Sequence, residues 1–475
     1  MRTLPAPSPS IPGADSIKAF LGAEVFEAWV ADFDRRISHV VDRIGYGLGH
    51  IEETVRQSAL ALQCQLVEKA MQAKADAIPA LCDKCLGPLV DTRVAKPRKI
   101  DIYCGKATLT RRYGFCGPCQ KWSFPADFAL GLLENSNASP LVQEMSALLV
   151  AKMPAAQAEE IIARVAGVSR SRSTMAREAL RQGERGTEII SHLLEDAGRG
   201  ILPKMATPPP TGGTVVVQID ALNVRERDDW GETEAMRAAG KPLDRWHWIY
   251  AATCFRLEQR CTTGGKQRAV ITDKSVIATR KGIDALMREL HFEAQLRGVA
   301  SAERVLVLAD GAVWIWNAAK DRFPVAIERL DLWHGNAYLW AVANELHGKD
   351  TAKAREWVKP LLKQVREDQT LQVITELEEL KKTLTEAQSQ AVVDKTVVYY
   401  KNNEPRMKYV DAEKRNEPNG SGAIESVCRQ LQCRVKRCGQ FWSIVGDEAI
   451  LRLETLWRNG HWARLFPHCE LQFAE

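Results

Sequence analysis

Apolar and polar positions follow distinct patterns along the chain, and the clearest pattern predicts buried β-strands. The run Thr214–Asp220, Thr-Val-Val-Val-Gln-Ile-Asp, is rich in β-branched residues and ends on a carboxylate. The run Arg304–Asp310, Arg-Val-Leu-Val-Leu-Ala-Asp, repeats the pattern and is followed by Gly311. An aspartate at the end of a buried strand emerges at the edge of a sheet, where a site can form. The pattern therefore marks both aspartates as candidate site residues.

The order of the predicted elements between residues 214 and 331 indicates a fold class. Further strands are expected at 246–256, 267–272 and 323–331, with a helix at about 280–297 and another opening at 312. Three hairpin strands, a helix, a parallel strand, a helix and a fifth strand make up the order of the RNase H-like α/β fold. Its first and fourth strands are neighbours, so Asp220 and Asp310 are expected to converge.

Other stretches have the spacing of helices. Residues 17–80 predict a pair of helices, which either dimerise or pack on the next domain. Residues 335–398 are helical and charged, and we expect them to form an insertion after the fifth strand. The segment Gly420-Ser-Gly-Ala-Ile-Glu-Ser then predicts a capped helix start that carries a third acid, Glu425.

Changes in composition divide the chain, which at 475 residues is too long for one compact core. The expected segments are a disordered Pro/Ser leader at 1–16, a helical region at 17–80, a zinc ribbon at 81–125, a helical, helix-turn-helix DNA-binding domain at 126–197, a linker at 198–213 and an RNase H-like catalytic domain at 214–475 with its helical insertion at 335–398. The sequence therefore predicts a multidomain protein.

Composition and charge narrow the class of protein. Hydrophobic residues make up 45% of the chain and charged residues 26%, which is ordinary for a soluble globular protein. The net charge of +5 is too small to indicate nucleic-acid binding by itself. The apolar runs fall short of the roughly 18 residues that cross a membrane, and the N-terminus lacks the apolar core of a secretory signal. We expect a protein of the reducing cytoplasm, without a membrane partner.

Four of the twelve cysteines have the spacing of metal ligands. They form two Cys-x2-Cys knuckles, whose thiolates can hold one structural Zn²⁺ in a tetrahedron. The segments 96–103 and 107–113 between the knuckles are expected to be the strands of the ribbon. The alternative is four unrelated buried cysteines. The predicted zinc ligands are Cys82, Cys85, Cys116 and Cys119.

Residues 156–177 have the pattern of a helix-turn-helix. The first helix is expected to end at Ala166, with Gly167 in the turn and Ser169 capping a second helix that can enter a major groove. An ordinary αα-hairpin with a basic face is the alternative.

Basic side chains cluster on three of these segments and are candidate DNA contacts. Their alternative role in each place is that of a solvated basic face. The candidates are Arg170, Arg172 and Arg177 on the second helix, Arg111 and Arg112 in the ribbon together with Lys96, Arg98 and Lys99, and Arg429, Arg434, Lys436 and Arg437 after the third acid.

Two strand-end aspartates and a helix glutamate suit phosphodiester chemistry. A phosphodiester is anionic, and water is a poor nucleophile at neutral pH. Two Mg²⁺ (or Mn²⁺) ions held by carboxylates can activate the attacking oxygen and stabilise the leaving oxygen. We assign Asp220 as the bridging ligand and Asp310 and Glu425 as ligands of one ion each. The alternatives are turn aspartates and a first-turn glutamate favoured by the helix dipole.

These acids lie in blocks that resemble a known family, the DDE transposases of bacterial insertion sequences, in particular the ISKra-type group with its distant Mutator-like relationship. The resemblance runs from the cysteine knuckles to Trp442. It implies an RNase H-like catalytic domain, a helical insertion before the glutamate, and an Asp-x2-His motif that shapes the site or contacts DNA. The matching blocks are Ile219-Asp220, Leu308-Ala-Asp310-Gly311, Asp331-Leu-Trp-His334, Gly420-Ser-Gly-Ala-Ile-Glu425 with Arg429, and Gly439-Gln-Phe-Trp-Ser443.

The resemblance implies an enzyme that binds double-stranded DNA at the terminal inverted repeats of its own element, then cleaves the strands and transfers them to target DNA. Choosing two ends implies a homodimer or a higher oligomer on DNA, associated with a bacterial nucleoid. Two alternatives stay open. One is a catalytically inactive DNA-binding regulator descended from a transposase, and the other is an RNase H-like nuclease without strand transfer.

Overall fold

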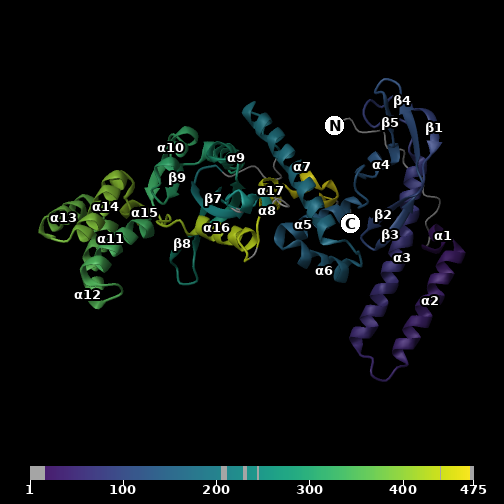
Figure 1. The fold of residues 1–475 in the computed structure, drawn as a ribbon, viewed down its shortest axis with the longest axis horizontal. Helices are drawn as coiled ribbons and strands as arrows, with labels where there is room; N and C mark the ends of the chain where they lie inside the picture. Colours follow the sequence, from purple (N-terminus) through teal and green to yellow (C-terminus); the bar gives the residue numbers. More distant parts are fainter. Residues whose placement is uncertain (1–16, 205–210, 228–232, 243–244, 439, 471–475) are drawn as a thin grey trace. The chain divides into compact units, whose positions relative to one another are not determined.

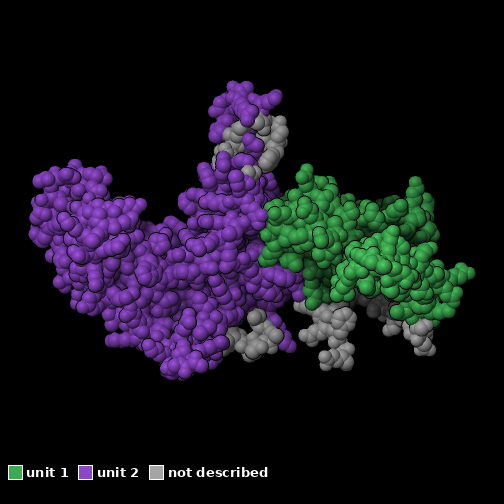
Figure 2. All heavy atoms as spheres, turned by 90° about the horizontal axis from the view of Figure 1, so that it is seen from below, with its two compact units in different colours: residues 1–182, 466–475 green, residues 183–465 purple. Residues whose placement is uncertain are grey.

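The computed structural model describes residues 17–204, 211–227, 233–242, 245–438 and 440–470 (Figure 1). The expected leader, part of the linker and Gly439 lie outside these residues. The chain is a multidomain, mixed α/β protein with two compact units, residues 1–182 with 466–475 and residues 183–465 (Figure 2). Among the described helices, none has the length and apolar character needed to span a membrane.

The first unit begins with helices, as the sequence predicts. They are α1 (Ile17–Leu21), α2 (Ala23–Val41) and the long α3 (Leu48–Ala77). Helix α3 packs against α2 and against the strand β3 (Gly105–Leu109), so the helical region is joined to the segment that follows it.

The cysteine knuckles belong to a three-stranded sheet of β1 (Val90–Val94), β4 (Arg112–Cys116) and β5 (Lys121–Ser123). The strands β2 (Arg98–Ile102) and β3 form a separate antiparallel hairpin. The prediction that segments 96–103 and 107–113 are the strands of the ribbon is therefore wrong for 96–103, which contains β2, and for 107–109, which belong to β3, whereas residues 112 and 113 do begin the ribbon strand β4. Ile100, Ile102, Ala107 and Leu109 form a buried apolar face that packs on α3, and this burial separates the hairpin from the knuckles.

Four helices complete the first unit or lead out of it: α4 (Pro125–Ala129), α5 (Pro140–Lys152), α6 (Ala155–Ala166) and α7 (Arg172–Gly198), which continues into the second unit. Helix α6 ends at the predicted residue, and Gly167 takes the left-handed conformation, with φ of 66°. The predicted cap at Ser169 is wrong. The second helix begins three residues later, where Ser171 Oγ accepts a hydrogen bond from Thr174 N at 3.4 Å.

The second unit is built on a five-stranded sheet in the order β10-β9-β6-β7-β8. The strands β6 (Thr214–Glu226), β7 (Arg245–Cys261) and β8 (Gln267–Thr279) form an antiparallel meander. The strands β9 (Arg304–Ala309) and β10 (Ile327–Leu330) run parallel to β6. The predicted strands and the predicted neighbourhood of the first and fourth strands are confirmed.

Both faces of the sheet are covered, which explains why its strands are continuous apolar runs. One face packs on α9 (Ile283–Leu296) and α10 (Val313–Arg322). The other carries α16 (Gly422–Val435), whose Ala423 packs against a small cluster around Val216. A short helix, α8 (Thr233–Ala238), lies between β6 and β7 in the chain.

The predicted helical segment after the fifth strand is confirmed. It consists of α11 (Leu332–His347), α12 (Ala352–Arg366), α13 (Thr370–Thr383) and α14 (Ala387–Asn403), which share a core with the sheet. The helices α15 (Val410–Lys414), α16, α17 (Ile444–Arg458) and α18 (Trp462–Leu465) complete the unit. The second half of α7 packs tightly on α17, because a Cβ at Gly183 would lie 2.6 Å from Ala449.

Candidate functional site

The central parallel strand pair brings the two predicted aspartates to the same level of the sheet. Gln218 on β6 is in register with Leu308 on β9, and each aspartate follows two residues later. Asp220 Oδ1 accepts a hydrogen bond from Ala221 N at 2.7 Å. Burial raises the pKa of Asp220, and the nearby charge of Asp310 adds to the rise. The two partly buried carboxylates therefore repel each other, and a bound cation would reduce this repulsion.

Helix α16 is attached to this end of the sheet through the side chain of Gln218. Its Nε2 donates to Gly420 O at 3.3 Å, and its Oε1 accepts from Ile424 N at 2.9 Å. Gly420 itself lies against the indole of Trp333, because a Cβ there would be 2.8 Å from Trp333 Cδ1. The first turn of the helix that carries Glu425 is thus fixed over the strand that carries Asp220.

Asp331, the residue that follows β10, makes the second attachment of α16 to the sheet. Its Oδ1 accepts from His334 N at 2.8 Å, and its Oδ2 accepts from Ser421 N. Burial alone would raise the pKa of Asp331, but the hydrogen bonds from His334 and Ser421 outweigh it and lower the pKa to about 2. Both oxygens of Asp331 thus bind backbone N–H groups, and its role in shaping the site or contacting DNA stays a prediction.

Glu425 lies closer to Asp331 and His334 than the sequence led us to expect. One ligand atom from each of these three residues lies within 4.8 Å of the others. Among the described residues, the set of Asp220, Asp310 and Glu425 does not reach that spacing. The cause is local: Glu425 Oε1 accepts a hydrogen bond from Ser421 Oγ at 2.9 Å, which holds the exposed carboxylate back over its own helix start.

The protonation of His334 depends on the acids of this cluster. The hydrogen bond with Asp331 raises the pKa of His334 above 6.5, and the charges of Asp310 and Glu425 add to the rise. The imidazolium therefore contributes stability that is complete below pH 6.5 and is lost as the pH rises through the raised pKa. We expect Asp331→Asn to lower the pKa of His334 in an NMR titration with chelator present. Asp321→Asn, at an exposed helix position, should leave the titration unchanged, and an equal shift in both variants would contradict the assignment.

Sequence reasoning missed Gln218, Tyr399 and Glu417 as parts of the site. Tyr399 on α14 donates from its hydroxyl to Asp310 O at 2.7 Å, which connects the helical insertion to the site strand. Glu417 accepts hydrogen bonds from Arg304 Nε and from Arg329 Nη2, both at 2.8 Å, and so anchors the segment that leads into α16. A polar residue inside the apolar run of β6 was the available signal for Gln218, because a buried amide needs partners.

Gln218→Leu should uncouple α16 from the sheet. The substitution keeps the volume but leaves Gly420 O and Ile424 N without their partner, and each unsatisfied buried group costs about 1–3 kcal/mol. We expect urea denaturation to show a loss of unfolding free energy of that order. Gln259→Leu on the exposed part of β7 is the matched control, and an equal effect of both variants would mean that the attachment is unimportant.

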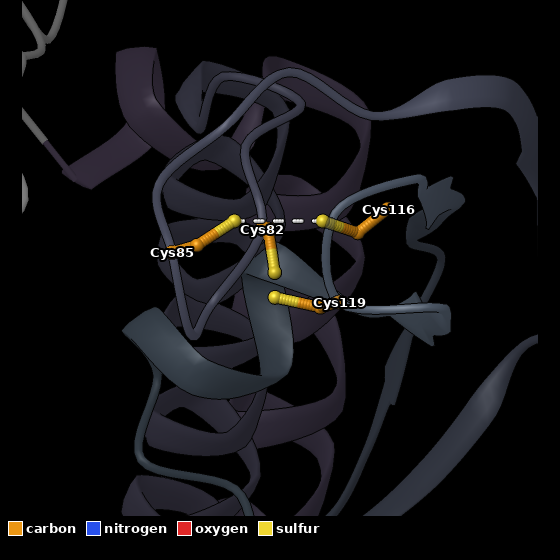
Figure 3. Close-up of side chains that lie close together, drawn as sticks. All are labelled: Cys82, Cys85, Cys116 and Cys119. Atoms are coloured by element: carbon orange, nitrogen blue, oxygen red, sulfur yellow. Dashed lines mark hydrogen bonds between the residues drawn. The ribbon is translucent and has the colours of Figure 1, made fainter.

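The four knuckle cysteines form a second candidate centre, in the first unit. Figure 3 shows that their sulfur atoms point toward one another, and all four lie within 4.8 Å of one another. The Sγ atoms of Cys85 and Cys116 are 3.5 Å apart. A tetrahedral Zn²⁺ with Zn–S bonds of about 2.3 Å needs sulfur separations of about 3.8 Å. The cluster therefore has the donors and the spacing for a structural metal such as zinc.

A backbone group beside the first knuckle favours the metal-binding thiolate form of Cys85. Lys84 N lies 3.4 Å from Cys82 Sγ and donates to it. A hydrogen bond from the Gly87 backbone lowers the pKa of Cys85 to about 7, whereas the contact with Cys85 raises the pKa of Cys119 to about 12. Four thiols at this spacing do not all ionise without a cation, so metal binding and deprotonation are coupled.

Four of the predicted DNA contacts are largely buried in ion pairs or against aromatic rings. Arg111 Nε donates to Asp127 Oδ2 at 3.0 Å, beside Arg98, which binds the same oxygen at 2.8 Å. Arg170 pairs with Asp101 at 3.1 Å, and its side chain is 3% exposed. Arg434 stacks on Trp442 at 4.9 Å, and burial lowers its pKa to about 10. These placements argue against phosphate contacts and give these side chains structural roles. The predicted contacts that are exposed are Lys96, Lys99, Arg112, Arg172, Arg177, Arg429, Lys436 and Arg437.

Comparison with known proteins found no significant match. No protein-family model matches the sequence, and no curated protein matches it significantly.

Proposed function

We propose that the second unit is an RNase H-like catalytic domain that cleaves and joins DNA strands with divalent ions, as a DDE transposase does. The observation that carries the proposal is the pair Asp220 and Asp310 on adjacent parallel strands, with the helix of Glu425 attached above them. The strand order β10-β9-β6-β7-β8 supports the fold class. The motif resemblance noted in the sequence supports the family.

The donor set fits hard divalent ions such as Mg²⁺ or Mn²⁺. Asp220, Asp310 and Glu425 offer carboxylate oxygens, the ligands that Mg²⁺ prefers. Asp220 is only partly buried and Glu425 is exposed, so substrate oxygens have access. Two bound ions would supply activation of the attacking oxygen and stabilisation of the leaving oxygen.

The protein's own residues then have separate tasks. Asp220 and Asp310 are rigid, since Asp220 lies within β6, Asp310 directly follows β9, and each accepts a backbone hydrogen bond. Glu425 is the adjustable ligand, because its side chain is exposed and held by one hydroxyl. Rotation of its side chain away from Ser421 would bring the carboxylate toward the aspartates. His334 supplies positive charge beside the acids, where a phosphate would lie.

We further propose that the first unit binds the DNA sequences at the ends of the element. Helices α6 and α7 flank a left-handed glycine, as in a helix-turn-helix, and Arg172 and Arg177 are exposed on the second helix. The zinc-binding sheet precedes them and exposes Arg112. A protein that joins two DNA ends requires two copies, so this function implies at least a dimer on DNA.

A reaction with DNA tests the proposal. The purified full chain is incubated with duplexes from the regions that flank its own coding sequence, with Mg²⁺ or with EDTA. We expect Mg²⁺-dependent nicks at discrete positions and, with supercoiled plasmid added, joined products. Cleavage without joined products would favour a nuclease that lacks strand transfer. Specific binding without cleavage would favour a catalytically inactive regulator.

A further inference from the structure

The hairpin of β6 and β7 extends beyond Asp220 and carries two exposed tryptophans on one face. Arg225 pairs with Trp246 across the strands, and Asn223 pairs with Trp248. Residues paired in this way lie on the same face of a sheet. Trp246 is 60% exposed and Trp248 is 51% exposed. Two large indoles at alternate positions of an exposed strand present a broad aromatic surface.

Two cationic side chains lie beside the Trp246 ring. The Arg225 guanidinium lies 5.7 Å from the Trp246 ring centre, and Lys436 Nζ lies 5.5 Å from it. Arg225 also lies 5.0 Å from the ring of Phe441. Glu226, the acid within the described part of β6 beyond Asp220, faces the opposite side of the strand, is 1% exposed and binds Arg280. We call Arg225, Trp246, Trp248, Lys436 and Phe441 the indole surface; its two charged members, Arg225 and Lys436, are both positive.

We propose that the indole surface binds single-stranded nucleic acid, with bases stacked on Trp246 and Trp248 and phosphates beside Arg225 and Lys436. Aromatic rings interleaved with cations match the alternation of bases and phosphates in a single strand. A duplex does not fit this surface, because its base faces are covered by their neighbours in the stack. The positive charge and the aromatic rings together distinguish this occupant from an apolar protein partner.

The position of the surface deepens the proposed function, on which this step rests. Trp248 and Trp246 lie opposite residues three and five places beyond Asp220 on β6, which corresponds to about 10 Å and 17 Å along the strand. Side chains alternate between the two faces of a strand, so the indoles lie on the face of β6 opposite to that of Asp220. The surface therefore offers a place for unpaired nucleotides on the other face of the hairpin from the acids, about 10 Å to 17 Å farther along β6.

Photocrosslinking locates the binding directly. The full chain is mixed, in EDTA, with oligonucleotides of thymidine that contain 5-iodouracil, irradiated, digested with trypsin and analysed by mass spectrometry. We expect the main adduct on the peptide 246–256, which contains both tryptophans. Adducts confined to other peptides, such as those of Trp122 or Trp333, would overturn the proposal.

Variants test the stacking itself. We expect Trp246→Leu and Trp248→Leu each to weaken binding of a single-stranded oligonucleotide about fivefold or more, whereas Trp246→Phe and Trp248→Phe, which keep an aromatic face, should retain most of the affinity. An oligonucleotide of abasic sites carries the same phosphates, and its weaker binding should be insensitive to the Leu variants. Equal loss on both oligonucleotides, or no loss on either, would overturn the proposal.

These measurements are made without divalent ions or strand cleavage. Their failure therefore leaves the proposed nuclease intact, and an inactive nuclease leaves the single-strand surface intact. Thermal unfolding of each variant is compared with that of the parent chain. Because both indoles are more than half exposed, we expect the unfolding temperatures to stay the same.

Discussion

Asp310→Asn should lower the rate of Mg²⁺-dependent DNA cleavage at least about 100-fold to 1000-fold, with DNA binding unchanged. The amide keeps the hydrogen bond to Ala312 N and the shape of the turn, but it removes a negative charge from the place where the ions would bind. Single-turnover cleavage with a labelled duplex measures the rate, and a mobility-shift assay measures binding. We expect Asp220→Asn to lower the cleavage rate to a similar extent, also with DNA binding unchanged.

The matched control for these variants is Asp321→Asn, on the exposed end of α10. It removes the same charge from the same unit but not from the candidate site. We expect full cleavage activity in this control. Activity of Asp310→Asn within a fewfold of the control would remove Asp310 from the site.

Cys116→Ser should abolish zinc binding and destabilise the first unit by several kcal/mol. Cys116 is the fully buried first ligand of the second knuckle, so its loss leaves three ligands and an incomplete tetrahedron. We expect elemental analysis to show a fall from about one zinc ion per chain to well below half. The first transition in thermal unfolding should move to lower temperature, and a chelator should move it in the parent chain as well.

Cys261→Ser tests whether this effect is specific, because Cys261 is exposed on β7, far along the chain from the knuckles. Zinc content and unfolding should match those of the parent chain. A parent chain that holds no zinc after expression in zinc-supplemented medium would contradict the metal centre.

The strands and their order could be predicted because the signal is local. Runs such as Val215–Val217 are continuous and β-branched, since both faces of β6 are buried, and the carboxylates at 220 and 310 interrupt them visibly. The pairing of β6 with β9 then follows from the few ways in which a meander, a helix and a parallel strand can form one sheet.

The roles of individual basic residues could not be predicted, because they depend on partners that are distant in the sequence. Arg170 looked like a groove contact on a helix, yet Asp101 on β2 is its partner. Arg111 looked like a surface residue of the ribbon, yet Asp127 on α4 binds it. Nothing in the local pattern distinguishes a buried, paired arginine from an exposed one.

The third acid shows the same limit at the site itself. The helix start at residues 420–425 was visible in the sequence, but the predicted cap is wrong, because the Ser421 hydroxyl makes no cap hydrogen bond and donates to Glu425. The direction of the Glu425 carboxylate was not visible, because it depends on the Ser421 hydroxyl and on Asp331, which accepts a hydrogen bond from the Ser421 backbone N–H. The spacing of residues in the sequence does not indicate which rotamer the Glu425 side chain adopts.

Anomalous diffraction from crystals soaked in Mn²⁺ tests the central claim most directly. If the acids form a catalytic metal site, anomalous density will appear in contact with the carboxylates of both Asp220 and Asp310, and Glu425 will turn toward it. Density elsewhere, with both aspartates left without an ion at saturating Mn²⁺, would contradict the account.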